Sequence, residues 1–173
     1  MFATIYLPNF YLQAALRHQA ELAAQPVALL DDQAAKAVII QLNQAAVDAG
    51  VREGMTPSQG LARSLALIVK TRLWAQEKLL DELLLQFAFT LAPYVEATAP
   101  GVCTVQFTDT KNILRNVERV IAQLAEASLT AQASIAPTPD ASFLAAHLAQ
   151  PVLQVDDAKD FLAPLSLETL AMN

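Results

Sequence analysis

Residues 2–11, FATIYLPNFY, open the chain and predict a short buried strand that runs from Phe2 to Leu7. Pro8-Asn9 stops this strand, because proline cannot donate a hydrogen bond to a neighbouring strand. A helix is expected from Phe10 to Ala24, since Asn9 is a favourable N-cap and apolar side chains recur behind it at helical spacing. The chain therefore begins with a strand that leads directly into a helix.

Residues 26–71 predict a small lobe of strands and short helices. Its strands are expected over residues 26–30, 37–42 and 65–71. A short helix begins at the N-cap Asn43 and stops at Gly50, since glycine is favoured just past a helix C-terminus. A second helix begins at Thr56-Pro57 and runs to about Ser64, because threonine is favoured at the N-cap and proline at the first helical position.

Two longer helices are predicted after this lobe, over residues 74–91 and 112–126. In the first, one buried face is expected to hold Leu79, Leu80, Leu83, Leu84 and Phe87. The remaining elements are strands over 102–108, 131–136 and 151–155, a short helix over 141–149 and the start of a helix over 165–170. This order predicts an α+β fold in which an antiparallel sheet carries the two long helices on one face.

The composition is typical of a folded domain that does not grip nucleic acid strongly by itself. Apolar residues make up 54% of the 173 residues and charged residues 16%, so a sizeable core can form. The net charge is −6, and the eleven Lys and Arg are scattered without a cluster of three. Because phosphate neutralisation supplies much of the affinity for nucleic acid, we expect at most weak DNA binding.

Cysteine use and hydropathy indicate the compartment. The single cysteine, Cys103, cannot form an internal disulfide, and no apolar run reaches the roughly 18 residues of a membrane span. The N-terminal residues have neither the basic start nor the apolar length of a signal peptide. These features predict a cytoplasmic protein with no membrane association.

Common catalytic motifs are missing from the sequence, which has no glycine-rich nucleotide-binding motif, no CxxC and no HExxH. His18 and His147 fall in expected helices and are interpreted as surface or packing residues. Asp31-Asp32 and Asp156-Asp157 follow expected strands, where paired carboxylates can bind metal, but solvated turn residues are the simpler interpretation. Cys103 is interpreted as a small core residue.

Five segments in order along the chain carry a resemblance to a known family. They are IYLPNFY at 5–11, PVALL at 26–30 with VIIQLN at 38–43, AGVREGM at 49–55, LAPYVE at 91–96, and SIAP at 134–137 with FLA at 143–145. Together they resemble the Y-family (DinB-like) lesion-bypass DNA polymerases, and most closely the ImuB-type subfamily. The resemblance implies a polymerase palm formed by residues 1–20 and 74–173, with a small α/β fingers lobe over 21–73.

The same resemblance implies that the metal-binding carboxylates of the family are missing. Nucleotidyl transfer uses two divalent cations held by carboxylates from adjacent palm strands. The family's acidic positions fall on Tyr6 and Pro8 near the first strand, and on Gly101 and Val102 in the hairpin. None of these four residues has a carboxylate for Mg²⁺. The resemblance therefore implies degenerate catalytic positions, no metal and no other cofactor.

The triphosphate contacts of the family are also replaced. Its tyrosine and arginine fall on Gln44 and Val47, and its lysine falls on Ala146. Tyr11, beside Phe10, keeps the family's sugar-sensing gate position, although aromatic packing at the strand–helix junction is the interpretation we favour. The resemblance thus implies that this chain has no nucleotide-binding site.

As a function, the resemblance implies a non-catalytic polymerase-like scaffold in DNA repair, SOS mutagenesis and translesion synthesis. The implied partners are a sliding clamp, a RecA-like ImuA partner and an error-prone replicative-type polymerase. The family continues into a thumb and a little finger that supply most duplex contacts. Neither is present in these residues, so we interpret the chain as part of a longer protein and expect weak DNA binding.

Two other hypotheses stay open. One is an active nucleotidyltransferase whose acids have moved to positions such as Glu96, Asp109 and Asp140. The other is an unrelated cytoplasmic protein-interaction domain, for which the low charge and abundant alanine and leucine would suffice. A palm topology would exclude the second of these hypotheses, and clustering of the three acids would favour the first.

Overall fold

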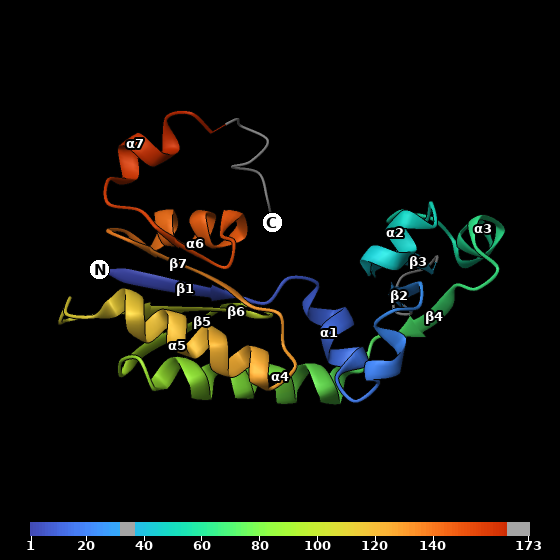
Figure 1. The fold of residues 1–173 in the computed structure, drawn as a ribbon, viewed down its shortest axis with the longest axis horizontal. Coiled ribbons are helices and arrows are strands. Elements are labelled where there is room, and N and C mark those ends of the chain that lie inside the picture. The colour runs from blue at the N-terminus through green and yellow to red at the C-terminus, as the bar shows by residue number, and fades with distance from the viewer. Residues whose placement is uncertain (32–36, 166–173) are drawn as a thin grey trace. The chain divides into compact units, whose positions relative to one another are not determined.

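The computed structural model describes residues 1–31 and 37–165. The chain forms two compact units, one made of Met1–Pro8 with Asp81–Asn173 and the other made of Asn9–Leu80. Each unit is built around its own sheet (Figure 1), and we call them the five-stranded unit and the three-stranded unit. The first strand of the chain therefore pairs with strands from the second half of the sequence. The three-stranded unit is an insertion in the sequence between these two parts of the five-stranded unit.

The sheet of the five-stranded unit has the strand order β5-β6-β1-β7-β8. Its strands are β1 Phe2–Tyr6, β5 Tyr94–Ala99, β6 Val102–Gln106, β7 Gln132–Ala136 and β8 Val152–Gln154. β1 pairs antiparallel with both β6 and β7, whereas β8 joins β7 in parallel. The segments predicted as strands over 2–7, 102–108 and 131–136 therefore lie side by side in one sheet. The sequence analysis does not predict the strand β5, which forms a hairpin with β6.

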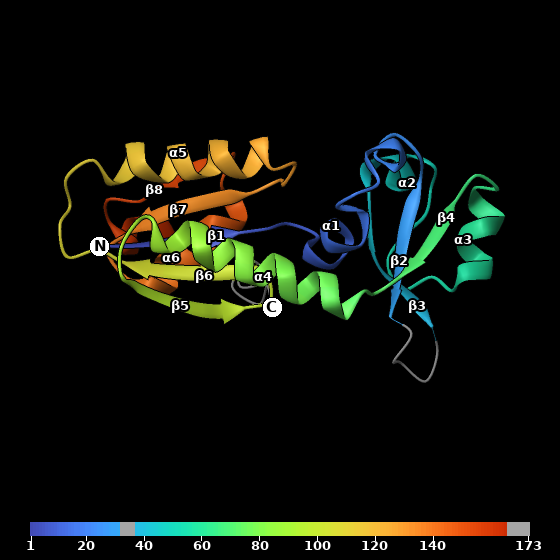
Figure 2. The ribbon, with the colours of Figure 1, turned by 90° about the horizontal axis from the view of Figure 1, so that it is seen from below.

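Helices cover both faces of this sheet. From Asp81 onward α4 (Trp74–Phe89) lies with α5 (Ile113–Glu126) on one face, and α6 (Pro139–Leu148) lies on the other (Figures 1 and 2). The predicted placement of the two long helices on a single face is confirmed. α6 adds cover on the opposite face, where its fully buried Ala141, Ala145 and Ala146 allow the helix to lie close to the strands.

The two long helices differ in how they bury their side chains. α5 buries Ile113, Val117, Val120, Ile121 and Leu124, the spacing of one face. In α4, Leu80 and Leu84 are buried, but Leu79 is 56% exposed. The prediction that Leu79 belongs to the buried face of this helix is therefore wrong. α4 is apolar around most of its circumference, so periodicity alone does not identify the side that packs.

The last described helix is α7 (Ala158–Leu162), which the sequence analysis does not predict. Its N-cap is Asp157, whose carboxylate accepts hydrogen bonds from the backbone N–H groups of Lys159 at 2.8 Å and Asp160 at 3.1 Å. The helix start expected over 165–170 falls almost entirely outside the described residues. Within the described ranges no helix combines the length and the apolar character needed to cross a membrane.

The three-stranded unit has the strand order β3-β2-β4, with β2 Val27–Asp31, β3 Val38–Leu42 and β4 Ile68–Thr71. β2 pairs antiparallel with β3 and parallel with β4. The two short helices of this lobe, α2 (Gln44–Asp48) and α3 (Pro57–Arg63), begin where the caps predict. Asn43 accepts a hydrogen bond from Ala46, and Thr56 forms a reciprocal capping box with Gln59. Gly50, at φ 84°, follows α2 as predicted.

The first helix is shorter than predicted. α1 spans Phe10–Leu16, and a separate 3₁₀ turn, η1, spans Ala20–Leu22. Asn9 is not a side-chain cap, because it adopts a left-handed backbone conformation (φ 50°) and makes no capping hydrogen bond. Instead, the Gln41 side chain from β3 accepts a hydrogen bond from the Leu12 N–H at 2.8 Å. A distant side chain thus replaces the local cap that the sequence suggests.

Candidate functional site

Tyr6, Gly101 and Val102 lie side by side in the five-stranded unit. Tyr6 is opposite Val102 in the antiparallel pairing of β1 with β6. The next step of the ladder is a 2.9 Å hydrogen bond from the Leu7 N–H to the Gly101 carbonyl. These three residues therefore adjoin on neighbouring strands. Pro8 lies two residues after Tyr6, the end of β1, and none of the four residues carries a charged side chain.

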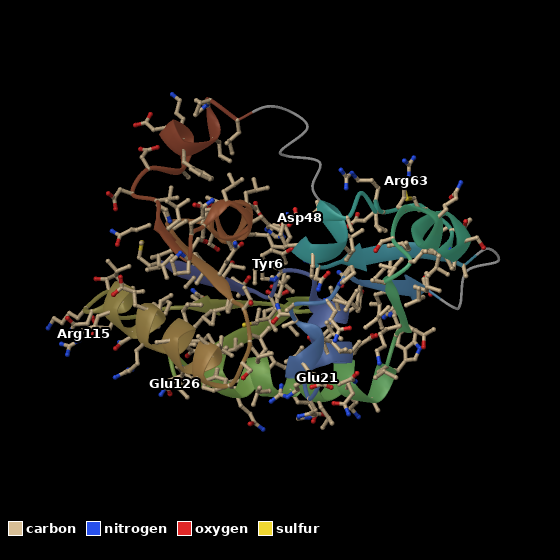
Figure 3. The ribbon with its side chains drawn as sticks, turned by 45° about the vertical axis from the view of Figure 1, so that its right-hand side comes forward. Tyr6, Glu21, Asp48, Arg63, Arg115 and Glu126 are labelled. Atoms are coloured by element: carbon tan, nitrogen blue, oxygen red, sulfur yellow. The ribbon has the colours of Figure 1, made fainter. Side chains whose placement is uncertain are left out.

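The Tyr6 side chain fills this place with an aromatic stack. It projects from β1 toward α6 (Figure 3), where its ring stacks on the ring of His147 with the two centres 4.1 Å apart. The His147 Nδ1 lies 2.8 Å from the Phe143 carbonyl oxygen, and the Phe143 ring is 4.7 Å away. His147 is therefore a packing residue, as its isolation in the sequence suggests. Burial raises the pKa of the Tyr6 phenol, so Tyr6 is neutral at pH 7.

Hydroxyl groups, not carboxylates, line the same side of the sheet next to Tyr6. Thr4 on β1 shares hydrogen bonds with Thr104 on β6 at 3.1 Å and with Ser142 on α6 at 2.8 Å. Thr98 on β5 extends this network to Thr104 at 2.9 Å, and Ser134 on β7 donates to the Ser142 carbonyl. Thr4, Ser134 and Ser142 are fully buried. These oxygens satisfy one another and carry no charge that would attract a cation.

The turn between β5 and β6 is held by an acid that the sequence analysis misses. The Asp81 carboxylate on α4 accepts a hydrogen bond from the Gly101 N–H at 2.8 Å. Gly101 has φ 72°, a conformation that side-chain-bearing residues rarely adopt. Because Asp81 is bonded to the backbone, it positions the hairpin. Nearby Cys103 is fully buried, and burial raises the pKa of its thiol to about 12, so it stays an unreactive core residue as predicted.

The positions expected for triphosphate contacts have other roles. Ala146 on α6 is fully buried in the five-stranded unit. In the three-stranded unit, the Gln44 amide donates to the Asp48 carboxylate at 2.8 Å, within α2. The Val47 carbonyl accepts a 2.8 Å hydrogen bond from the exposed guanidinium of Arg52. Arg52 therefore places a cation at the end of α2, beside Val47.

Tyr11 is part of a cation–aromatic cluster in the three-stranded unit. The Arg72 guanidinium carbon lies 3.9 Å from the centre of the Tyr11 ring and 3.9 Å from that of Trp74. Two hydrogen bonds, of 2.9 and 2.6 Å, join Arg72 to the Glu77 carboxylate. Phe10 meets the Tyr11 ring edge-on at 5.3 Å. These contacts favour a packing role for Tyr11, as the sequence analysis prefers.

The acids of the alternative enzyme hypothesis do not converge. Glu96 is an exposed residue of the edge strand β5. Asp109 follows the end of β6 that pairs with Phe2, and Asp140 begins α6 after the end of β7 that also pairs with Phe2. Both therefore lie at the end of β1 opposite to Tyr6. Across residues 1–31 and 37–165, no group of three His, Cys, Asp or Glu side chains has the geometry of a metal site.

Asp156 and Asp157, which the sequence analysis also singles out, have structural roles. Asp156 accepts a 2.9 Å hydrogen bond from the Gln154 amide, and Asp157 caps α7. Asp31 is the last residue of β2, and Asp32 lies outside the described residues. The interpretation of Asp156-Asp157 as turn residues at a strand end is therefore confirmed.

Comparison with known proteins identifies the fold. DinB from Sulfolobus solfataricus superposes with a TM-score of 0.82 at 13% identity, over 97% of this chain and 52% of that chain. A post-insertion binary complex of Dbh DNA polymerase superposes with a TM-score of 0.86 at 14% identity, over 97% of this chain and 52% of that chain. A Y-family DNA polymerase chimera, Dbh-Dpo4(243-245)-Dbh, superposes with a TM-score of 0.83 at 14% identity, over 97% of this chain and 53% of that chain. The chain thus spans about half the length of these structures, and at such identities the likeness shows the fold alone.

The family follows from the sequence comparison. No curated protein matches the chain. A family model described as the impB/mucB/samB family matches residues 5–147, from within β1 almost to the end of α6. The predicted α+β fold class and the resemblance to Y-family polymerases are both confirmed. Because the match covers most of its length, this chain belongs to the impB/mucB/samB family and has the fold of Y-family DNA polymerases.

Proposed function

We propose that this chain is the palm-and-fingers part of a non-catalytic, polymerase-like protein that acts in DNA repair and translesion synthesis. Family membership and fold support a role related to DNA polymerases. The observation that carries the non-catalytic proposal is the Tyr6–His147 stack beside Val102 and Gly101, at the positions where the family's pattern has its acids.

The chemical argument concerns charge. In metal-dependent phosphoryl transfer, two cations held by carboxylates stabilise the charge on the transferring group and on the attacking and leaving oxygens. Tyr6, Gly101 and Val102 offer a neutral phenol, a hydrogen and an isopropyl group. Mg²⁺ requires oxygen ligands, usually including one or two carboxylates, in near-octahedral geometry. A stacked, half-buried phenol does not meet that requirement, and positioning alone does not replace the missing charge.

The remaining assignments belong to the same proposal. Residues 1–20 and 74–173 would act as the palm and residues 21–73 as the fingers. The described sheets and helices support this division in outline, although α1 packs in the three-stranded unit. A retained fold with replaced catalytic groups is suited to a scaffold. We propose a sliding clamp, a RecA-like ImuA partner and an error-prone polymerase as its partners, in a cytoplasmic SOS response.

A primer-extension assay tests the loss of catalysis. The chain, and the full-length protein that contains it, are incubated with primer–template, all four nucleotides and Mg²⁺ or Mn²⁺. We expect no extension, while Dbh DNA polymerase extends the primer under the same conditions. Extension that depends on the added metal and stops with a chelator would overturn the proposal.

Restoring the acids provides a second measurement. The triple variant Tyr6→Asp, Gly101→Asp, Val102→Glu should also remain inactive, because Gln44, Val47 and Ala146 leave the triphosphate without its contacts. Gly101→Asp in addition places a side chain at φ 72°, where the backbone is strained for any residue with a Cβ. Gain of extension in this variant would show that the acids alone were missing.

A further inference from the structure

We infer that Trp74 is a stacking platform for an unpaired base of single-stranded nucleic acid. Trp74 is the single tryptophan of the chain and the first residue of α4, and it is 55% exposed. Tryptophan is highly buried on average in folded proteins, so an indole that is more than half exposed is unusual. Exposed aromatic rings on which bases stack are the common element of sequence-tolerant single-strand binding.

The Trp74 ring is held in place by a side chain packed against one of its faces. Arg72 lies 3.9 Å from the ring centre of Trp74 and, at the same distance, from that of Tyr11. Its guanidinium is fixed by two hydrogen bonds to Glu77, and the two charged side chains are only 13% and 7% exposed. One face of the indole is therefore covered by a fixed cation. An indole fixed in this way would lose little conformational entropy when a base stacks on its exposed surface.

The charge of this unit is compatible with an anionic ligand, whereas that of the rest of the chain is strongly negative. Residues 9–80 contain seven Lys and Arg against six Asp and Glu, whereas the rest of the chain contains four against eleven. Lys78 is exposed and lies one helical turn after Trp74, where it can meet a phosphate. Glu77 and Asp31 both raise the pKa of Arg72, so negative charge lies close by. The local positive balance is thus small, and binding should be weak and sensitive to salt.

Single strands fit these features better than the other candidate ligands do. In duplex DNA the bases are already stacked on their neighbours and are not available to the indole. A protein partner would need a wider apolar surface than the one along this stretch, where charged Lys78 lies between exposed Leu73 and Leu79 in the sequence. The inference concerns the three-stranded unit and is independent of whether the proposed catalytic loss is correct.

Tryptophan fluorescence tests the inference directly, because all indole emission comes from Trp74. Oligothymidylate of about eight nucleotides is titrated into the chain at low salt, a length within the usual range of single-strand sites. We expect saturable quenching that fades as salt rises. An abasic oligonucleotide of equal length presents the same phosphates without bases and should quench little. A duplex of the same length should also quench little.

Variants test whether binding of the single strand depends on Trp74. With a dye-labelled oligothymidylate followed by anisotropy, Trp74→Ala should weaken binding about tenfold, and Lys78→Gln should lower the salt slope by about one. Phe89→Ala removes another aromatic side chain of α4, 56% exposed, and should leave affinity unchanged. Circular dichroism checks that each variant folds.

Several results would overturn the inference. The first is an absence of quenching by oligothymidylate in the unmodified protein, a measurement that no misfolded variant can obscure. Another is equal affinity for the abasic strand, which would indicate phosphate contacts without stacking. Equal quenching by an acidic peptide would assign the indole to a protein partner.

Discussion

The two units of this chain differ in charge and in how they fix their polar groups. The five-stranded unit has four basic against eleven acidic residues, and its central polar network is made of uncharged hydroxyls around Thr4. The three-stranded unit is nearly neutral, and its central polar feature is the Arg72–Glu77 ion pair with Tyr11 and Trp74. The unit that contains Tyr6, Gly101 and Val102 is thus the less suited of the two to polyanions.

The comparison distinguishes the residues that build the fold from the residues that the family's reaction would need. The residues that build the sheet pairing, the helix caps and the core are present in both units. Tyr6, Val102 and Ala146, which the proposed function places at the metal and phosphate positions of the family's pattern, are packing residues in this structure. A fold can keep its core while the groups of its reaction are replaced, because few of those groups contribute to burial.

The largest expected effect compares two leucines of α4. Leu84 is 1% exposed and Leu79 is 56% exposed. Leu84→Ala should lower the free energy of unfolding by about 2–5 kcal/mol, because it opens a cavity in the core. Leu79→Ala should change it by less than about 0.5 kcal/mol. Urea denaturation followed by circular dichroism measures both, and equal effects would contradict the assignment of the buried face.

Substitutions of Tyr6 should have the next largest effect on stability. Tyr6→Asp removes the stack on His147 and half-buries a carboxylate beside the apolar Val102, so it should cost about 2–3 kcal/mol of stability. Tyr6→Phe keeps the stacking ring and should cost less than about 1 kcal/mol. Urea denaturation at pH 7 measures both variants. If Tyr6→Asp proves as stable as the native chain and gains stability with Mg²⁺, the site is a metal site that has merely lost one ligand.

The Arg72–Glu77 ion pair of the three-stranded unit should contribute less to stability than the Tyr6 stack does. Glu77→Gln keeps the shape of the side chain but removes the charge that holds Arg72, and should cost about 1.5–3 kcal/mol. Glu53→Gln, an exposed change in the same unit, is the matched control and should stay within about 0.5 kcal/mol. Thermal unfolding monitored by Trp74 fluorescence reports both. Equal costs would mean that Arg72 does not depend on Glu77.

The smallest effect concerns duplex DNA. Because the chain is acidic overall, its affinity for a primer–template should be weaker than about 10⁻⁵ M and should fall further as salt rises. Anisotropy of a labelled duplex, measured at several salt concentrations, checks this. Tight binding that persists at high salt would show that the charge difference between the units does not limit contact with DNA.

Sequence patterns were sufficient where a structure depends on neighbours a few residues apart. The caps at Asn43 and Thr56, the glycine at position 50 and the face of α5 follow from spacing within one or two helical turns. Spacing also located the strands β1, β6 and β7. It failed for the N-cap at Asn9, because the hydrogen bond that the Leu12 N–H donates at this helix start is accepted by Gln41 on another element. It failed for β5, whose exposed residues lack an alternating apolar pattern.

The sequence by itself determined that no carboxylate stands at Tyr6, Pro8, Gly101 or Val102, because residue identity needs no coordinates. Only the tertiary structure decided what fills their place. The stack of Tyr6 on His147 and the bond of Asp81 to Gly101 join residues that are far apart in the chain and meet because α6 and α4 pack on opposite faces of one sheet. Such contacts leave no periodic signal, since each arises from a single pairing of distant elements.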